Sequence, residues 1–533
     1  MRLPRGLPSS GVALLAGLAQ AASIAAPWNG QPLWWLQLLS LAVLAGLLAG
    51  CGEREAAWRS STWADARPRP AWRRCAWLGW VFATAWLTGT FWWLFISMHT
   101  YGGLAAPLAV LAVLALAGAL ALYYAAVGAV FVRIVQGKPL AGRAWPALVF
   151  AALWTLAELA RGRWLTGFPW GAGGYAHTEG LLAGYAPWIG VYGIGALAAW
   201  VAAELGMALA CRAPTGWGRR AALGLVLALP AVLGMADLRF SEPAGRLGVA
   251  LLQGNIPQNE KFQRGTGVIE ALRWYGQQLQ TAQASLVVAP ETAIPLLPRQ
   301  LPDGYWAALT ARFQTGNQGA LVGVPLGSLA EGYTNSVLGL TPGRAQPYGY
   351  DKHHLVPFGE FIPWGFRWFT EMMDIPLGDF NRGSVGQPSL DWRGQRLAPN
   401  ICYEDLFGEE LGARFADPAR APTAMVNLSN IAWFGDTVAI DQHLQISRMR
   451  ALEFERPMLR ATNTGATVII DHRGVVTHAL PRHTRGVLLG EFEGRNGLTP
   501  YARWVATLGL WPLWALALAL VAAGAWSRRR HSR

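Results

Sequence analysis

The sequence predicts a multi-span α-helical membrane domain joined to an α/β layered domain that lies outside the cytoplasm. Of the 533 residues, 53% are hydrophobic and only 14% are charged, whereas soluble proteins average about 25% charged residues. Apolar stretches close to the ~20 residues that cross a bilayer recur along the chain. Between residues 238 and 503 they give way to alternating strand-like and helix-like segments.

The apolar stretches predict about eight transmembrane helices. They fall at residues 10–27, 32–50, 75–96, 104–132, 145–160, 185–210, 219–237 and 504–526. Basic residues gather in the loops after the second, fourth and sixth stretches and in the tail SRRRHSR. Both termini are therefore expected in the cytoplasm. Arg161 and Arg163, after the fifth stretch, break this pattern.

The first apolar stretch has a second interpretation. A basic start, a short apolar core and the small residues Ala21, Ala22 and Ala25 are also typical of a cleaved signal peptide. The many later stretches favour an uncleaved anchor. Cleavage would leave the rest of the topology unchanged.

The distribution of charge argues against a nucleic-acid partner. Residues 238–503 hold 24 Lys and Arg against 24 Asp and Glu, so the whole net charge of +13 lies among the hydrophobic stretches. That location is typical of cytoplasmic loops that orient a membrane protein, and not of a basic surface for phosphodiesters. The chain has no CxxC and no HExxH motif, so no metal site is expected.

Three domains are expected. Residues 1–238 would form a membrane domain of about seven helices, residues 239–503 the α/β domain, and residues 504–533 a last transmembrane helix with a basic tail. Within 239–503 the buried-strand candidates are short, apolar and bounded by Gly, Pro or Asn. They are GRLGVALLQGNI, SLVVAPETAI, GALVGVPLG, RLAPNICYE, PTAMVNLSN and PMLRATNTGATVII.

Three residues beside these strands supply the parts of a covalent-catalysis site. Cys402 ends an apolar strand, and the other cysteines lie in or beside hydrophobic stretches. Glu291 ends SLVVAPE, and Lys352 opens YDKHHLVPFGEF in a block with only one other lysine. A carboxylate can accept a thiol proton, and a compact ammonium can stabilise an oxyanion. Each residue alone also fits a structural role, as a buried thiol or a solvated strand end.

Neighbouring residues suggest supporting roles. Glu360 and Glu404 are candidates for ordering the site, and hydrogen bonds within their own loops are the alternative. His353 and His354 suggest a Cys–His pair, but adjacent strand residues point to opposite faces, so at most one could reach the thiol.

These residues resemble the nitrilase superfamily of carbon–nitrogen hydrolases, whose αββα sandwich carries Glu, Lys and Cys in this order. The segments LQGNIPQ, YDKHHLVPFGEFIP and NICYEDLF look like the apolipoprotein N-acyltransferase family within it. TGFPWGAGGY and QHLQISRMRALEFERP are similar to the same family, and the resemblance covers essentially the whole chain. Phe262 departs from it, standing where the family usually has Trp, and so does Ile431, where an acidic residue is expected.

The resemblance implies a catalytic mechanism without metal or cofactor. Glu291 would be the general base, Lys352 the oxyanion stabiliser and Cys402 the nucleophile. Glu360 would support Lys352, while Tyr403 and Glu404 would order the loop behind the cysteine. The thiolate would take the sn-1 acyl chain of a phospholipid, typically phosphatidylethanolamine. It would pass that chain to the α-amine of a diacylglyceryl-cysteine on an apolipoprotein.

Both substrates keep their acyl chains among membrane lipids, so a lipid-facing entrance is expected at the bacterial inner membrane, with the catalytic domain in the periplasm. Apolar loops at 361–380 and 431–434 are its candidates. The residues singled out are Phe262, Phe361, Trp364, Trp433 and Phe434.

Two other functions remain open from the sequence. A membrane-anchored amidase or nitrilase would use the same triad on a small C–N substrate, with water as the acceptor. A transporter or scaffold would explain the intramembrane carboxylates Glu158 and Glu204. Those two isolated carboxylates, without matching repeats, do not outline a transport path.

Overall fold

The structure, a computed structural model, describes residues 8–59, 70–136, 144–211, 216–235, 239–344, 346–372 and 379–531. It divides into two compact units. The first comprises residues 1–92, 110–238 and 510–533, and the second comprises residues 93–109 and 239–509. The segment 93–109, which the expected boundaries assign to the membrane domain, thus groups with the second unit.

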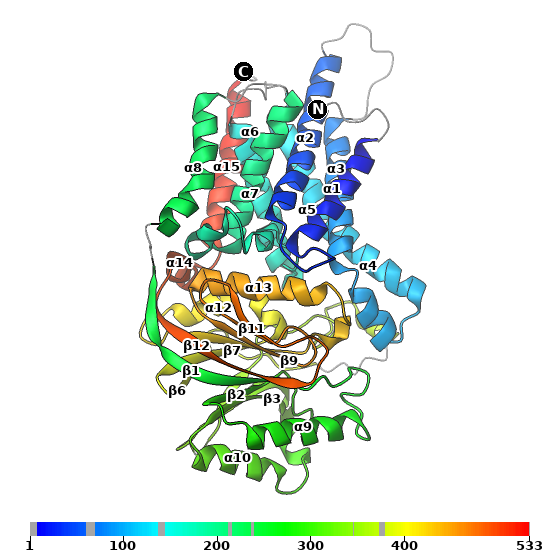
Figure 1. Cartoon of the computed structure of the whole chain (residues 1–533). Helices are drawn as coiled ribbons and strands as arrows, with labels where there is room; N and C mark the ends of the chain where they lie inside the picture. Colours follow the sequence, from blue (N-terminus) through cyan, green and yellow to red (C-terminus); the bar gives the residue numbers. More distant parts are fainter. Residues whose placement is uncertain are drawn as a thin grey trace. The chain divides into compact units, whose positions relative to one another are not determined.

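The first unit consists of helices joined by loops and contains no strand over its described residues. Its helices, with α4 shared between the units, are α1 (Ser9–Ile24), α2 (Trp34–Arg59), α3 (Ala71–Phe91), α4 (Ala106–Leu120), α5 (Leu122–Val135), α6 (Trp145–Arg163), α7 (Ala186–Cys211), α8 (Trp217–Met235) and α15 (Trp511–His531). Each expected apolar stretch coincides with at least one helix (Figure 1).

Three described helical segments are long and apolar enough to cross a membrane, namely Trp34–Cys51, Ala106–Val135 and Ala183–Cys211. A fourth is added if Pro500–Leu508 and Trp511–Ser527 form one broken span. The helices are therefore compatible with a membrane protein. The basic loops that predict orientation fall partly on residues 60–69, 137–143 and 212–215, which lie outside the described residues.

Small residues bring the helices of the first unit close together. A Cβ atom added to Gly17 would collide with the Phe82 carbonyl of α3, and one added to Gly206 would collide with the Ala42 carbonyl of α2. Close backbone approach of this kind gives helices van der Waals contact, which matters in lipid because apolar burial alone does not drive association there.

The buried charges of α6 bind the polypeptide that follows that helix. Arg161 is 1% exposed; its Nε lies 3.0 Å from the Tyr124 hydroxyl, and Nη1 donates to the Trp170 carbonyl at 2.8 Å. Glu158 accepts a hydrogen bond of 3.0 Å from the Gly173 main chain. Arg161 therefore breaks the loop-charge pattern because it is a structural residue inside the helix bundle.

Glu204, the other carboxylate of the expected apolar stretches, forms an ion pair with Arg219 of α8. Both carboxylates that suggested a transport path thus have partners within the helical unit, and a structural role accounts for each of them.

The second unit contains two six-stranded mixed sheets. The first has the order β12-β1-β2-β3-β4-β5 and the second the order β11-β10-β9-β8-β7-β6. Their strands are β1 (Ser241–Gln253), β2 (Leu286–Ala289), β3 (Gly319–Ser328), β4 (Gly332–Leu340), β5 (Tyr348–Asp351), β6 (Leu390–Trp392), β7 (Gln395–Ile401), β8 (Ala424–Ser429), β9 (Met458–Thr462), β10 (Val468–Ile470), β11 (Val476–Ala479) and β12 (Gly486–Gly497).

The two sheets pack face to face and helices cover their outer faces (Figure 1). Leu251 and Val288 of the first sheet share one apolar core with Val426 and Leu459 of the second. The alternate residues of β1 and β2 pack instead against α9 (Gly267–Thr281) and α10 (Tyr305–Thr315). On the far side α13 (Ala439–Phe454) packs on β9. The α/β layered domain expected from the strand pattern is confirmed, as four layers in the order αββα.

Strand direction brings the candidate catalytic residues to one edge of the sandwich. In the first sheet β2 and β3 are parallel, and β5 runs the same way because two antiparallel pairings separate it from β3. In the second sheet β7, β8 and β9 are parallel. The segments after β2, β5, β7 and β8 therefore leave the sheets at their carboxyl ends, where α/β proteins gather functional groups.

Candidate active site

Glu291, Lys352 and Cys402 lie at strand ends in the structure. Glu291 follows β2 by two residues, Lys352 directly follows β5, and Cys402 directly follows β7. The Lys352 ammonium lies 3.4 Å from Glu291 Oε1. The Asn430 main-chain N–H, after β8, donates to Glu291 Oε2 at 2.9 Å and also faces the Cys402 thiol. The structure thus brings together the three residues singled out as base, cation and nucleophile.

A second carboxylate completes a buried ion cluster around Lys352. Glu360 Oε2 lies 2.9 Å from the Lys352 Nζ. The Asn335 side-chain amide donates to both Glu291 and Glu360, at 2.7 Å in each case. The Val356 main chain donates to Glu360 at 2.8 Å. One ammonium therefore serves two carboxylates, and Asn335 fixes the spacing between them.

Lys352 is held in its charged form. Its side chain is only 1% exposed, and burial by itself lowers the pKa of an ammonium. The carboxylates of Glu360 and Glu291 outweigh that effect and raise the pKa of Lys352 above its usual value. A permanent, immobile cation beside a nucleophile suits the stabilisation of an oxyanion.

The Cys402 thiol is protonated at rest. Burial, followed by the Glu291 carboxylate, raises the pKa of Cys402 to about 12, against smaller effects of Lys352 and the Asn430 main chain. At neutral pH the site therefore holds a neutral thiol beside a carboxylate, an arrangement in which Glu291 could accept the thiol proton. Cys402 also has a backbone φ of 52°, a left-handed conformation that is uncommon for a residue with a side chain.

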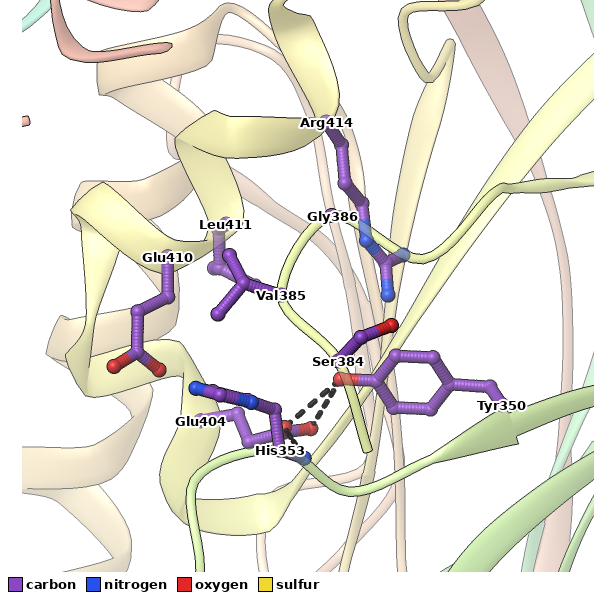
Figure 2. Close-up of a pocket in the computed structure, with 9 residues that line it drawn as sticks. All are labelled: Tyr350, His353, Ser384, Val385, Gly386, Glu404, Glu410, Leu411 and Arg414. Carbon is purple, nitrogen blue, oxygen red and sulfur yellow. Dashed lines mark hydrogen bonds between the residues drawn. The ribbon is translucent and has the colours of Figure 1, made fainter. Parts of the chain in front are cut away.

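Glu404 orders the turn that carries Cys402. Its carboxylate accepts a hydrogen bond of 2.6 Å from the Ile401 main chain, 2.7 Å from the His353 main chain and 2.8 Å from the Tyr350 hydroxyl. Figure 2 shows Tyr350 and His353 converging on it from the end of β5. Glu404 thereby ties the segment that carries Lys352 to the segment that carries Cys402.

The pocket in Figure 2 lies behind this junction. Its lining includes Glu404, Glu410 and Arg414 but none of Glu291, Lys352 and Cys402. It is therefore a neighbour of the Glu291–Lys352–Cys402 cluster and not the place where the thiol would meet a substrate.

The two adjacent histidines are engaged elsewhere. His353 Nδ1 lies 2.7 Å from the Gly383 carbonyl, and His354 Nδ1 lies 3.0 Å from Glu410. The His354 ring also stacks on Phe407 with centroids 3.4 Å apart. These three contacts favour the Glu–Lys–Cys arrangement over a Cys–His pair.

A buried polar network behind Cys402 was missed from the sequence. Asp405 accepts hydrogen bonds from His443 at 2.8 Å and from Ser447 at 2.5 Å, and Arg460 Nη1 lies 3.3 Å from it. Burial would raise the pKa of Asp405, but His443 and Arg460 hold it below its usual value. His443 and Ser447 are four residues apart on α13 and share one face, a spacing within QHLQISRMRALEFERP that could have revealed the network.

The entrance candidates divide into an exposed and a packed group. Trp364 is 99% exposed and Phe262 is 43% exposed. Phe434 packs on Trp93 with ring centroids 4.2 Å apart, and Trp433 lies edge-on to Tyr101 at 5.9 Å.

The partners of the packed group are Trp93 and Tyr101. Both belong to the segment 93–109, which follows α3, includes the start of α4 and is part of the second unit. Phe361 is partly buried and packs under the Arg382 guanidinium at 4.8 Å. Of the loop 361–380, residues 373–378 lie outside the described residues.

Over the described residues, no group of three or more His, Cys, Asp or Glu side chains is placed to hold a metal ion. The ionisable groups near Cys402 are instead used in ion pairs and hydrogen bonds with one another.

The αββα sandwich with Glu, Lys and Cys at one edge is the architecture of a carbon–nitrogen hydrolase, and the family model named carbon-nitrogen hydrolase matches residues 248–500. A second model, the apolipoprotein N-acyltransferase N-terminal domain, matches residues 13–204. The chain belongs to the apolipoprotein N-acyltransferase family, as the resemblance predicted.

Three relatives bearing the name apolipoprotein N-acyltransferase illustrate the match. The protein of Verminephrobacter eiseniae is 60% identical over 93% of this chain and 92% of its own length. That of Ralstonia nicotianae is 47% identical over 88% of this chain and 86% of its own. That of Bordetella bronchiseptica is 42% identical over 86% of this chain and 89% of its own.

Proposed function

We propose that this protein transfers the sn-1 acyl chain of a phospholipid to the N-terminal amine of diacylglyceryl-cysteine on apolipoproteins. The observation that carries the proposal is the convergence of Glu291, Lys352 and Cys402 at one edge of the sandwich. Membership of the family supports an acyltransferase of lipoprotein maturation. Phosphatidylethanolamine is the donor that the resemblance suggests.

The first half-reaction forms a thioester on Cys402. The thiol proton moves to Glu291 while the sulfur attacks the ester carbonyl, whose π electrons move to oxygen. Lys352 and the Tyr403 main-chain N–H, directly after the nucleophile, stabilise that oxyanion. The oxyanion then collapses, the C–O bond breaks, and Glu291 returns its proton to the departing lysophospholipid.

The second half-reaction consumes the thioester. The neutral α-amine attacks the thioester carbonyl and loses a proton to Glu291, and the Cys402 sulfur leaves and recovers that proton. The product is an amide, and the free enzyme is regenerated. One nucleophile thus serves donor and acceptor in turn, which is a ping-pong scheme that requires no cofactor or metal.

The membrane arrangement follows from the substrates. Eight spans with both termini in the cytoplasm would place the catalytic unit on the periplasmic side of the bacterial inner membrane, where both lipid-anchored substrates reach it. The helices at each expected apolar stretch and the basic tail support this topology.

Purified protein mixed with radiolabelled phospholipid tests the proposal. The polypeptide should acquire a label that hydroxylamine releases, and an apolipoprotein acceptor should then remove it. The label should be absent from Cys402→Ala and absent or very slow in Glu291→Gln. Ammonia release from small amides without any lipid product would replace the proposal with a membrane-anchored amidase.

A further inference from the structure

Lys261 is a second buried lysine beside the catalytic base. It lies between β1 and α9, is 1% exposed, and donates a hydrogen bond of 3.0 Å to the Glu291 main-chain carbonyl. The chain has only three lysines, and two of them contact Glu291. The scheme above gives Lys261 no part in the reaction. Burial of an ammonium costs free energy unless the ammonium is paired and hydrogen-bonded, so the position of Lys261 calls for an explanation.

The hydrogen bond from Lys261 holds the turn that aims the base. Thr292, directly after Glu291, has a φ of 48°, which is an unfavourable conformation for a β-branched residue. Rotation of the Glu291–Thr292 peptide would relieve that strain, and it would also carry the Glu291 carbonyl away from the ammonium. At the other end of the residue, the Asn430 main chain holds the carboxylate at 2.9 Å. Glu291 is therefore held at both its backbone and its side chain.

The charge of Lys261 balances the catalytic cluster. The carboxylates of Glu291 and Glu360 share one cation, Lys352, so the three groups together carry one net negative charge. Lys261 supplies the positive charge that balances these three groups. When the Cys402 proton moves to Glu291 and an oxyanion forms, the sum stays neutral with Lys261 and negative without it. In a buried site with little solvent screening, an uncompensated negative charge disfavours both the thiolate and the oxyanion.

We propose that Lys261 is a positioning residue of the active site, which anchors the Glu291 turn and supplies the positive charge that lets Cys402 ionise as it attacks. Its reaction role rests on the proposed function. Its effect on the thiol does not, because it acts before any lipid is bound.

The titration of Lys261 gives this role a distinctive pH dependence. Burial lowers the pKa of Lys261 to about 8, although Glu291 and Cys402 favour its charged form. The other charged groups of the cluster are Lys352 and Glu360, and the next charged groups are Glu404, which acts on Lys352, and Arg460, which acts on Cys402. The balancing charge is thus present at pH 7 and is lost as the pH rises through about 8. Phe262, whose ring centroid is 5.8 Å from the ammonium, adds no titrating group.

The test measures alkylation of Cys402 by iodoacetamide from pH 6.5 to 9.5, without lipid, in a background where the other three cysteines are Ser. Lys261→Met should react about tenfold more slowly than the parent at pH 7, the effect of about one unit in thiol pKa. The two rates should approach each other above about pH 8, where Lys261 is neutral in the parent as well. A merely structural loss would leave the ratio independent of pH.

One further variant separates the anchoring role of Lys261 from its charge, and a second variant serves as a control. Lys261→Gln keeps a donor for the Glu291 carbonyl but not the charge, so it should resemble Lys261→Met at pH 7. Arg312→Met is the matched control, because Arg312 donates to the Leu279 and Ala282 carbonyls and lies outside the catalytic cluster. It should keep the parent's alkylation profile. Thermal unfolding of each variant shows that the proteins compared are folded.

The results distinguish the two proposals. A parental alkylation profile in Lys261→Gln, or a pH-independent rate ratio in Lys261→Met, would overturn the charge role of Lys261. Absence of a phospholipid-derived thioester on the wild-type protein would overturn the proposed function and leave the alkylation result standing. If both hold, thioester formation in Lys261→Met should be slowed at least about tenfold at pH 7.

Discussion

Two buried ion clusters, one in each unit, differ in whether a thiol and a proton acceptor lie within them. In the helical unit, Glu158 and Arg161 are matched one to one, and their remaining hydrogen bonds go to Tyr124 and to main-chain groups of the following loop. In the sandwich, Lys352 faces two carboxylates, and a thiol lies beside one of them.

The two clusters differ in whether a proton can move between their members. The Glu158–Arg161 cluster is balanced, and its partners are groups that neither donate a proton in a reaction nor attack a carbonyl. The Glu291–Lys352–Glu360 cluster contains a base next to a neutral thiol, so a proton can move within it. Burial of charge alone therefore does not mark a catalytic site, whereas an adjacent nucleophile and proton acceptor do.

The largest effect should follow from removing the nucleophile or the base. Cys402→Ala should abolish thioester formation, and Glu291→Gln should reduce it at least about 10³-fold, because the thiol then has no proton acceptor. Single-turnover labelling with phospholipid measures both. Comparable labelling of Cys402→Ala would show that another residue carries the acyl group and would remove the distinction between the clusters.

A smaller loss should follow from unbalancing the sandwich cluster. Lys352→Met should slow acylation about 10²- to 10³-fold, the usual cost of removing one oxyanion donor. Glu360→Gln should cost less, because Glu291 still pairs with the ammonium. Pre-steady-state acylation rates at saturating lipid measure the effect. Unchanged rates in Lys352→Met would mean that this cation, like Arg161, is only structural.

The Asp405 network behind Cys402 should affect stability and, through it, the acylation rate. Asp405→Asn is expected to lower the free energy of unfolding by about 3 kcal/mol, the usual cost of breaking a buried ion pair, and to slow acylation about tenfold by loosening the Cys402 turn. Denaturant unfolding at several pH values and single-turnover labelling measure the two effects.

The sign of its pH dependence follows from the pKa shifts. The pKa of Asp405 is below its usual value because His443 and Arg460 outweigh the effect of burial. The pKa of His443 is also below its usual value, mainly because the imidazole is buried. The unfolded chain therefore binds more protons than the folded one, and stability falls as the pH drops below about 6.5 and again below about 4. Asp405→Asn should weaken the second decline. An unchanged acid profile would mean that Asp405 does not control it.

The exposed entrance residue should affect lipid binding and not chemistry. Trp364→Ser is expected to raise the apparent KM for a phospholipid donor several-fold, as one large apolar contact is lost, and to spare a short soluble thioester. Trp433→Ser is the matched comparison, because Trp433 packs against Tyr101 within the same unit. Equal losses on both substrates in Trp364→Ser would refute the entrance role.

The smallest effect on chemistry is expected from the helical cluster. Arg161→Met should lower the melting temperature, because Glu158 and the loop carbonyls lose a buried partner. The acylation rate of the folded fraction should stay within about twofold of wild type. Thermal unfolding and labelling of the same detergent-solubilised sample measure the two quantities. A specific loss of acylation at full stability would extend the active site into the helical unit.

Local patterns in the sequence were sufficient for an α/β layered domain and for the candidate residues at strand ends, whereas the αββα order was implied by the family resemblance. A short apolar strand followed by a polar residue indicates a carboxyl edge wherever it occurs, which is why Glu291, Lys352 and Cys402 could be selected one by one. The family resemblance then predicted their joint role. The contacts of Asn335 and Asn430 with Glu291 were not predicted. An asparagine within or after a strand has no sequence pattern that distinguishes a hydrogen-bond donor of the site from an ordinary strand or turn residue.

What the amino-acid order determines here is therefore mostly local: apolar length, strand alternation, charge balance along the chain and the residue that ends each strand. Tertiary structure decided which groups distant in the sequence form buried hydrogen bonds and ion pairs with one another. Lys261 meets Glu291 across 30 residues, Asp405 meets His443 and Arg460, and residues 93–109 join the catalytic unit. Such pairings depend on how sheets and helices pack, and electrostatic energy depends on the distances and burial that result.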